Sequence, residues 1–153
     1  MTERPAPNAH DEPEVVRYHV DGPVAYVTLA RPAFSNAQNA RMTYAIDDAY
    51  RTAVEDDAVA VIVLRGEGKH FSAGHDIGTP GRDVDLDYPR VATLQYRHVD
   101  KPGAERHYVR EAEQFLGMCR RWREIPKPTI AAVRGACIAG GLMLAWTCDL
   151  IVA

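Results

Sequence analysis

The sequence predicts an α/β fold, and three observations lead to this prediction. Short runs rich in β-branched residues recur along the chain, and between them apolar residues fall at helical spacing. The order is two strands, a helix, a strand, a long helix, a strand, a helix and a last strand, which is typical of α/β domains. The length of 153 residues and the hydrophobic content of 46% suit one globular domain with its own core.

The first half of the chain predicts a hairpin, a helix and a strand. Val15–Val20 and Val24–Leu29 are strand-like runs joined by Asp-Gly-Pro, a sequence typical of hairpin turns. Asn39 is placed to cap a helix that runs to about Val54. The expected apolar face of this helix is Met42, Ala45, Ile46, Ala49, Tyr50 and Ala53. Val59–Leu64 is apolar without alternation, which predicts a strand covered on both faces.

The second half predicts a long loop and then further helices and strands. Residues 78–106 are charged, interrupted by proline and without periodicity, so we expect a surface loop that is either a functional lid or disordered. His107–Ile125 predicts a helix. Its expected apolar face is Tyr108, Ala112, Phe115, Leu116, Cys119 and Trp122. Thr129–Val133 and Leu150–Ala153 predict strands, and Gly140 to about Thr147 predicts the helix between them.

Composition argues against several classes of function. A net charge of -3 and a pI near 6.0 give no basic field, so we expect no nucleic-acid partner. No apolar run reaches the length of a membrane span, so we expect no membrane insertion. Residues 1–14 are polar and proline-rich without the apolar segment of a signal peptide, which predicts a disordered tail before one domain over residues 15–153. The three cysteines form no CxxC pair and indicate reduced residues in a cytoplasmic protein.

The most informative stretch is Ile130–Asp149, which reads as a strand, a glycine turn and an apolar helix that opens on Gly140-Gly141. Backbone N–H groups at such a helix start are unshielded, and the helix dipole favours negative charge there. The turn can therefore be an oxyanion site, or it can let the helix pack tightly on a sheet. Taken alone it favours tight packing, because helices that open on glycine are common.

Three segments together point to a known family. The loop Asn36-Ala37-Gln38-Asn39 precedes a helix with Met42 near its start, the strand VIVLRGEG runs into FSAGHDI, and KPTIAAVRGACIAGGLMLAWTCDLIVA follows. In this order and spacing they resemble the crotonase (enoyl-CoA hydratase/isomerase) superfamily from about Val15 to the end of the chain. The resemblance implies a superhelix of ββα turns that carries acyl-CoA thioesters. It also implies a chain truncated before the C-terminal helical region, so the family's homotrimers or hexamers are doubtful for this chain.

The same resemblance implies a site in which two backbone N–H groups polarise the thioester carbonyl. One belongs to His75, just after the Ala-Gly pair, and the other to Gly140 in the glycine turn. Further contacts to the substrate are expected from Asn36, Ala37, Ala73, Gly74, Asp76, Ile77, Gly141 and Met143. Cations for the phosphates of CoA are sought among Arg31, Arg65 and Lys69, although charged residues in turns are more often simply solvated. CoA is then a substrate carrier, and no cofactor or metal is expected.

One position departs from the family pattern. Hydratases of this family carry a catalytic glutamate three residues after the oxyanion glycine, and this chain has Met143 there, which cannot transfer a proton. The leading hypothesis is an acyl-CoA-processing enzyme of the enoyl-CoA hydratase/isomerase type, a lyase or isomerase of fatty acid metabolism whose hydratase activity is in doubt. The alternative is a catalytically silent acyl-CoA-binding or assembly subunit, or an unstable truncated fragment.

The sequence also predicts roles for individual side chains. The His75 imidazole is a general base or, in the favoured interpretation, faces solvent while its backbone acts. Asp76 is expected to accept hydrogen bonds from nearby backbone N–H groups, and a catalytic role for it is the less favoured alternative. Met143 is expected to line the pocket for the acyl chain beside Leu142 and Leu144. Both tryptophans, Trp122 and Trp146, are expected in the core.

Overall fold

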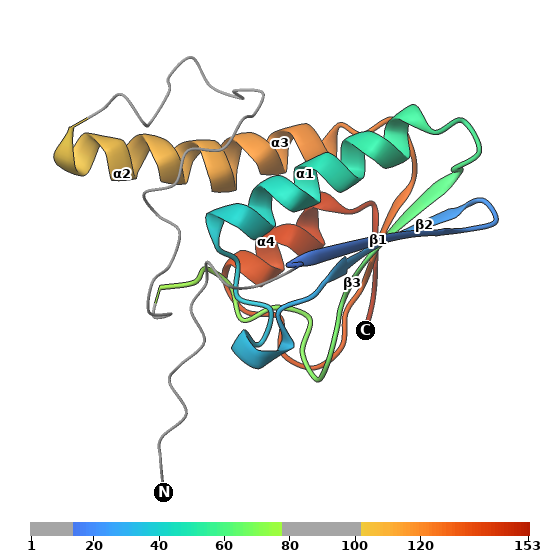
Figure 1. Cartoon of the computed structure of the whole chain (residues 1–153), viewed down its shortest axis with the longest axis horizontal. Helices are drawn as coiled ribbons and strands as arrows, with labels where there is room; N and C mark the ends of the chain where they lie inside the picture. Colours follow the sequence, from blue (N-terminus) through green and yellow to red (C-terminus); the bar gives the residue numbers. More distant parts are fainter. Residues whose placement is uncertain (1–13, 78–101) are drawn as a thin grey trace, which may run out of the picture.

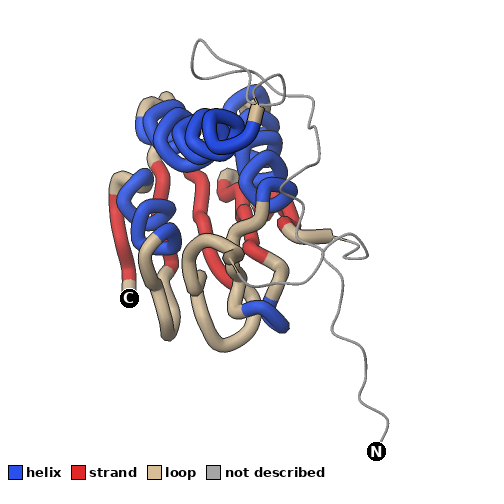
Figure 2. Tube along the Cα trace, turned by 90° about the vertical axis from the view of Figure 1, so that its left-hand side faces the viewer, coloured by secondary structure: helices blue, strands red, loops and turns tan. Residues whose placement is uncertain are grey.

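The computed structural model describes residues 14–77 and 102–153, and the predicted tail up to residue 13 and the loop segment 78–101 lie outside the described residues. The described part has a five-stranded sheet in the order β1-β2-β3-β4-β5, in which β1 and β2 are antiparallel and the later pairs parallel. Figure 2 shows the strands side by side, and in Figure 1 the helices α1, α2 and α3 cross above them. The predicted α/β class is confirmed.

The hairpin forms as predicted from its turn sequence. The strands are β1 (Val16–Asp21) and β2 (Val24–Leu29), and they pair from Val16 opposite Leu29 to Asp21 opposite Val24. The turn residue Gly22 has a φ of 53°, a conformation that glycine adopts without strain. The next strand, β3 (Val61–Gly66), begins two residues later than predicted.

Burial along β3 alternates, so the predicted cover on both faces is complete on one face and partial on the other. Ile62 and Leu64 are fully buried, whereas Val61 and Val63 are half-buried. The apolar residues Val61 and Val63 therefore lie on the face of the sheet that is only partly covered.

Helix α1 (Ala40–Glu55) has the predicted start and the predicted apolar face. The Asn39 side chain accepts a hydrogen bond of 2.9 Å from the backbone N–H of Met42, which confirms the N-cap. Met42, Ile46 and Ala53 are fully buried in the core beneath the helix. This interaction also fixes the end of the 36–39 loop.

The long second helix starts earlier than predicted and is not regular. It consists of α2 (Gly103–Glu111), a π-helical segment η3 (Ala112–Gly117) and α3 (Met118–Arg123), so residues 103–106 are helical and not part of a loop. Tyr108 and Leu116, placed on the apolar face by the sequence, are 77% and 55% exposed. The wider π turns change the helical phase, so Glu113 and Gln114 are buried there instead.

The last elements are β4 (Thr129–Ala132), α4 (Gly140–Thr147) and β5 (Leu150–Val152), which confirm the predicted order. Trp122 lies in the core as expected, but Trp146 is 64% exposed, so its predicted burial is wrong. Helix α4 is apolar nearly all round, and within the described residues only one side of it meets the core. Strand β5 is at the sheet edge, and all three of its residues are exposed.

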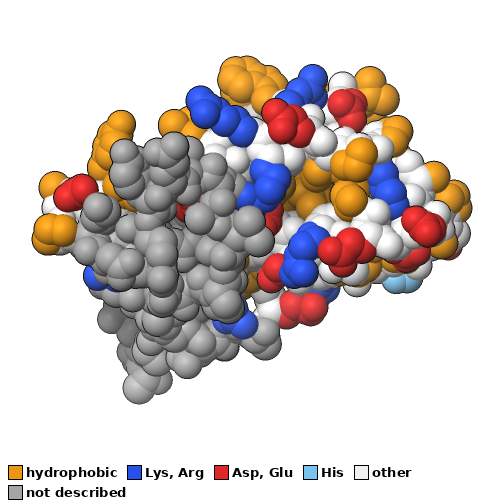
Figure 3. Space-filling view, turned by 90° about the horizontal axis from the view of Figure 1, so that it is seen from above, with side chains coloured by type: hydrophobic (Ala, Val, Ile, Leu, Met, Phe, Trp, Pro, Cys, Tyr) orange, Lys and Arg blue, Asp and Glu red, His pale blue; other side chains and the backbone are white. Residues whose placement is uncertain are grey.

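The described surface carries no field of one sign on the face seen in Figure 3. Basic, acidic and apolar side chains are mixed across that face. Among the described residues, no helix has the length and hydrophobicity that crossing a bilayer requires.

Candidate active site

Three segments meet at one end of the sheet: the loop 36–39, the segment 72–77 and the start of α4. Gln38 forms a parallel bridge with His75, in which the Gln38 N–H donates to Gly74 O at 2.7 Å and the Asp76 N–H donates to Gln38 O at 2.9 Å. A second parallel bridge joins Ser72 to Cys137 in the loop that leads into α4. The resemblance named all three segments, and the fold brings them together.

Asn36 holds its loop in place from the inside. Its side chain is fully buried and its φ of 53° is left-handed, a conformation that asparagine tolerates. The amide donates to the carbonyls of Glu67 at 2.9 Å and His70 at 2.8 Å, and its oxygen accepts from the Arg31 N–H at 2.9 Å. Because these polar atoms are used within the protein, Asn36 supports the loop and its side chain is not free for a ligand.

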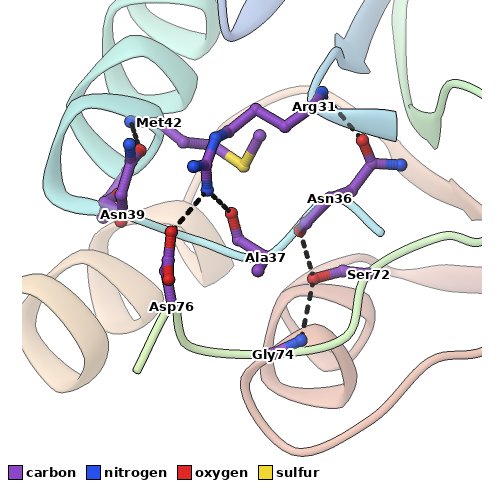
Figure 4. A network of polar contacts seen from close by, with 9 residues as sticks. Arg31, Asn36, Ala37, Asn39, Met42, Ser72, Gly74 and Asp76 are labelled. Atoms are coloured by element: carbon purple, nitrogen blue, oxygen red, sulfur yellow. Dashed lines mark hydrogen bonds and ion pairs between the residues drawn. The ribbon is translucent and has the colours of Figure 1, made fainter. Parts of the chain in front are cut away.

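Two polar residues that sequence reasoning gave no role, Ser72 and Gln38, also fasten the site. Figure 4 shows the Ser72 hydroxyl between Asn36 and Gly74: it donates to Asn36 O at 2.8 Å and accepts from the Gly74 N–H at 3.2 Å. It also lies 3.2 Å from the donating Gln38 Nε2. The signal available in the sequence was the position of both residues inside the two motifs that carry the resemblance.

A buried ion pair links the 36–38 loop to the segment after His75. Arg31 Nη1 lies 3.0 Å from Asp76 Oδ2, with the two side chains 1% and 2% exposed (Figure 4). Arg31 also donates to the carbonyl of Ala37 and lies over the Phe34 ring. The expectation that Arg31 contacts CoA phosphates is therefore wrong, because its guanidinium is buried. Of the three candidate cations, Arg65 and Lys69 are exposed.

The tight-packing interpretation of the glycines is confirmed. Gly74 has a φ of 95°, and a Cβ there would lie 2.8 Å from Ile138 O. A Cβ on Gly141 would lie 2.5 Å from Ser72 O. Both positions therefore need glycine so that the 72–77 segment can lie against the start of α4.

The N–H groups of His75 and Gly140 both lie at this junction. The bridge to Gln38 uses the Gly74 carbonyl and the Asp76 amide, so the His75 N–H faces away from Gln38. Gly140 opens α4, where an N–H has no partner within the helix, and a Cβ on Gly74 would lie 3.2 Å from its nitrogen. Neither N–H donates to another residue of the described part of the chain.

Ala139, just before α4, has an unusual backbone conformation for a residue with a side chain. Its φ of 47° and ψ of -111° lie outside the regions that L-residues prefer. Strain of this kind costs about 1–3 kcal/mol and is concentrated at functional sites. The strained residue directly precedes Gly140, whereas the next N–H of α4, that of Gly141, donates to Ile138 O at 2.8 Å.

Replacing Ala139 by glycine is expected to raise the free energy of unfolding by about 1 kcal/mol, because the relieved strain exceeds the added unfolded-state entropy. Urea denaturation measures this change. Ala60→Gly is the matched control, since Ala60 is exposed and its φ is not positive, and it should lower stability. Equal stability of the two variants would contradict the strain at Ala139.

The imidazole of His75 packs against the protein, so the solvent-facing interpretation of this side chain is wrong. The ring stacks on Phe115 with centroids 3.4 Å apart, and the side chain is 31% exposed. Burial lowers the pKa of His75 below its usual 6.5, while the nearby carboxylate of Glu111 acts in the opposite direction. The Cδ2–Nε2 edge of the ring lies against α4, because a Cβ on Gly140 would lie 2.4 Å from His75 Cδ2.

The remaining predicted residues differ in their surroundings. Met143 is half-buried and lines a hollow of about 370 Å³. The other lining residues are Leu116, Cys119, Arg120, Arg123, Glu124, Trp146 and Thr147. Leu144, expected beside Met143, is a core residue instead, whereas Ala73 is half-buried and Ile77 exposed. A larger hollow, of about 600 Å³, lies between α1 and α3 and contains none of the predicted site residues.

The cysteines are poor candidates for nucleophiles. Burial raises the pKa of all three thiols, that of Cys119 to about 11, so little thiolate forms at neutral pH. Across the described ranges, no group of three or more His, Cys, Asp or Glu side chains is arranged to hold a metal ion. The polar groups at the junction are backbone N–H groups, the Gln38 amide, the Ser72 hydroxyl and the His75 imidazole.

Comparisons with known proteins identify the family. The family described as Enoyl-CoA hydratase/isomerase matches residues 24–153. EchA13 of Mycobacterium tuberculosis is 40% identical over 151 residues, which are 92% of this chain and 45% of that protein. 4-Chlorobenzoyl coenzyme A dehalogenase-2 of an Arthrobacter species is 32% identical over 88% of this chain and 42% of its own length.

A solved structure is similar in sequence and in fold. The crystal structure of a probable enoyl-CoA hydratase from Mycobacterium smegmatis has a TM-score of 0.71 and 42% identity, covering 89% of this chain and 47% of that one. The chain thus spans slightly less than half the length of the relatives it matches. From the family match, the sheet and these likenesses, this chain belongs to the enoyl-CoA hydratase/isomerase family, with the crotonase fold.

Proposed function

We propose that the chain binds an acyl-CoA thioester and polarises its carbonyl between the backbone N–H groups of His75 and Gly140. One observation carries this proposal: both N–H groups lie at the same junction and neither donates to another described residue. The N–H of Gly140 also gains from the dipole of α4. Negative charge that develops on the thioester oxygen is stabilised by donors of this kind, fixed before the reaction begins.

The rigidity of the junction supports the same proposal. The Arg31–Asp76 pair, the Asn36 amide and the Ser72 hydroxyl hold the segment around His75 from inside the protein. Donors that are already in position need no reorganisation when charge forms on the oxygen. The names of the relatives supply the substrate class, because enoyl-CoA hydratase and 4-chlorobenzoyl coenzyme A dehalogenase both refer to CoA thioesters.

Residues on the surface around the junction can contact the rest of the substrate. Ala37, Ala73 and Ile77 are half-buried or exposed and can contact the pantetheine arm. Met143 and the hollow that it lines can accept an apolar acyl group. The exposed cations Arg65 and Lys69 are the candidates for the phosphates of CoA.

The reaction we favour is one other than simple hydration. Met143 occupies the place of the family glutamate, and its thioether cannot activate water. Isomerisation, or a lyase reaction through an enolate, uses the same pair of N–H groups with a different proton carrier. The second candidate is a silent subunit that binds acyl-CoA, and Met143 favours this alternative as well.

Infrared difference spectroscopy of a bound acyl-CoA with a ¹³C-labelled thioester carbonyl tests the proposal. We expect the carbonyl band to move to lower frequency on binding, because hydrogen bonds to the oxygen weaken the C=O bond. Crotonyl-CoA followed by its thioester absorbance should show little hydration. Absence of acyl-CoA binding, or binding without a carbonyl shift, would contradict the proposed site.

A further inference from the structure

The imidazole of His75 has an environment that the two-donor site does not require. Its backbone N–H serves the proposed site whatever its side chain is, yet the ring is fixed by contacts from two other elements. Phe115 of η3 stacks on one face, at an interplanar angle of 26°. Gly140 of α4 leaves room for the Cδ2–Nε2 edge of the ring, with which a side chain at position 140 would collide.

The two ring nitrogens of His75 have different surroundings. Nδ1 lies 3.8 Å from Oε2 of Glu111, the last residue of α2. Nε2 is buried and has no hydrogen-bond partner within the described residues. A carboxylate beside Nδ1 favours the neutral tautomer with its proton there, which leaves the lone pair on Nε2.

Nε2 also lies close to Gly140, whose N–H we propose as a donor to the substrate carbonyl. It is 2.8 Å from the position of a Cβ on Gly140. A carbonyl oxygen that accepts a hydrogen bond from the Gly140 N–H would lie about 2.9 Å from the backbone nitrogen of Gly140. The carbon next to the carbonyl is only two bonds from this oxygen, so a ring whose Cδ2–Nε2 edge lies against Gly140 is placed near a thioester bound there.

We propose that the His75 imidazole, with Glu111 beside it, removes and returns a proton at the carbon next to the thioester carbonyl; this inference rests on the proposed function. It assigns to His75 the proton transfer that Met143 cannot perform. The same residue then contributes its backbone N–H to the oxygen and its side chain to the carbon.

The proposed step is balanced without a co-reactant. The C–H bond beside the carbonyl breaks as an Nε2–H bond forms, and the C–H electron pair becomes the C=C bond of an enolate. The carbonyl π pair moves onto the oxygen held by the two N–H groups. The imidazolium then returns its proton to the same carbon, or to a carbon conjugated with it, which moves a double bond.

The protonation state of His75 agrees with a base. Burial lowers its pKa below 6.5, so the ring is neutral at pH 7 and can accept a proton. Glu111 raises that pKa and stabilises the imidazolium once it forms. The other charged group close to His75 in sequence, Asp76, is paired with Arg31.

Exchange of the hydrogens beside the carbonyl of butyryl-CoA in D₂O, followed by NMR, tests the proposal without depending on the overall reaction. His75→Gln keeps the backbone N–H and removes the base, so exchange should fall by about 10²- to 10⁴-fold. Binding and the infrared carbonyl shift should persist in this variant. An exchange rate close to that of the wild type would overturn the inference.

The pH profile gives a second, independent readout. Exchange should fall as pH drops through the pKa of His75, and Glu111→Gln should move this acid limb to lower pH, because the carboxylate raises that pKa. Glu55→Gln removes the same charge from the exposed end of α1 and should leave the profile unchanged. If His75→Gln unfolds, the Glu111→Gln profile decides alone, and an unmoved acid limb overturns the inference.

The two proposals fail in different ways. A wild-type chain that binds butyryl-CoA and shifts its carbonyl band, but exchanges no hydrogen, overturns the role of the imidazole and leaves the two-donor site intact. A wild-type chain that does not bind the thioester overturns the proposed function itself.

Discussion

Replacing Asp76 by alanine is expected to lower the free energy of unfolding by about 3–5 kcal/mol, because it leaves the buried Arg31 guanidinium without this carboxylate. The two side chains are 1% and 2% exposed, so solvent does not screen the remaining charge. Urea denaturation measures this loss, with the same m-value (the dependence of the unfolding free energy on urea concentration) used for both proteins. The effect should extend to the site, because the Asp76 N–H is part of the bridge between Gln38 and His75.

Two controls separate this effect from a general loss of charge. Asp48→Ala removes a carboxylate 2.8 Å from Arg51, but both side chains are well exposed. The urea concentration at the midpoint of unfolding should therefore hardly change. The double variant Arg31→Met with Asp76→Leu replaces the pair by apolar groups and should recover most of the lost stability. If Asp76→Ala and Asp48→Ala unfolded at the same urea concentration, the buried ion pair would not be what stabilises the loop.

Replacing Gly140 by proline is expected to slow thioester turnover by about 10²- to 10³-fold, the usual effect of removing one oxyanion donor. Proline is tolerated at the first position of a helix, so α4 should still form. The rate is measured with the acyl-CoA ester that the wild-type chain converts fastest. The infrared shift of the bound carbonyl should decrease at the same time.

Gly140→Ala is the necessary control for this experiment. Any Cβ at this position lies 2.4 Å from His75 Cδ2, so both variants displace the imidazole. Alanine keeps the N–H and proline lacks it, so the difference between them reports the lost donor together with the effect of the proline ring on Ala139. Equal rates and equal carbonyl bands for the two variants would show that the Gly140 N–H does not act on the substrate.

The elements that could be predicted are those specified by residues close together in the sequence. The Asp-Gly-Pro turn specifies the β1–β2 hairpin, and the Asn39 cap specifies the start of α1, because each depends on residues a few positions apart. The long helix shows the limit of such reasoning. Its π segment changes the helical phase, so the predicted burial of Tyr108 and Leu116 is wrong although the helix itself is correctly expected.

The candidate site was predicted in part. The resemblance pointed to the segments that carry His75 and Gly140, and the fold brings these segments together. It did not predict that Asn36 is wholly occupied within the protein. Nor did it predict that Arg31 is buried in an ion pair with Asp76.

By itself, the sequence determined the α/β class, the family and the missing carboxylate at Met143, because these depend on residue types and their spacing. Only the tertiary structure decided what the His75 side chain touches. Its partners, Glu111 and Phe115, lie on a helix that follows it in the chain at a distance of more than 30 residues. Contacts over such a separation depend on how a helix packs against a sheet, which no local pattern encodes.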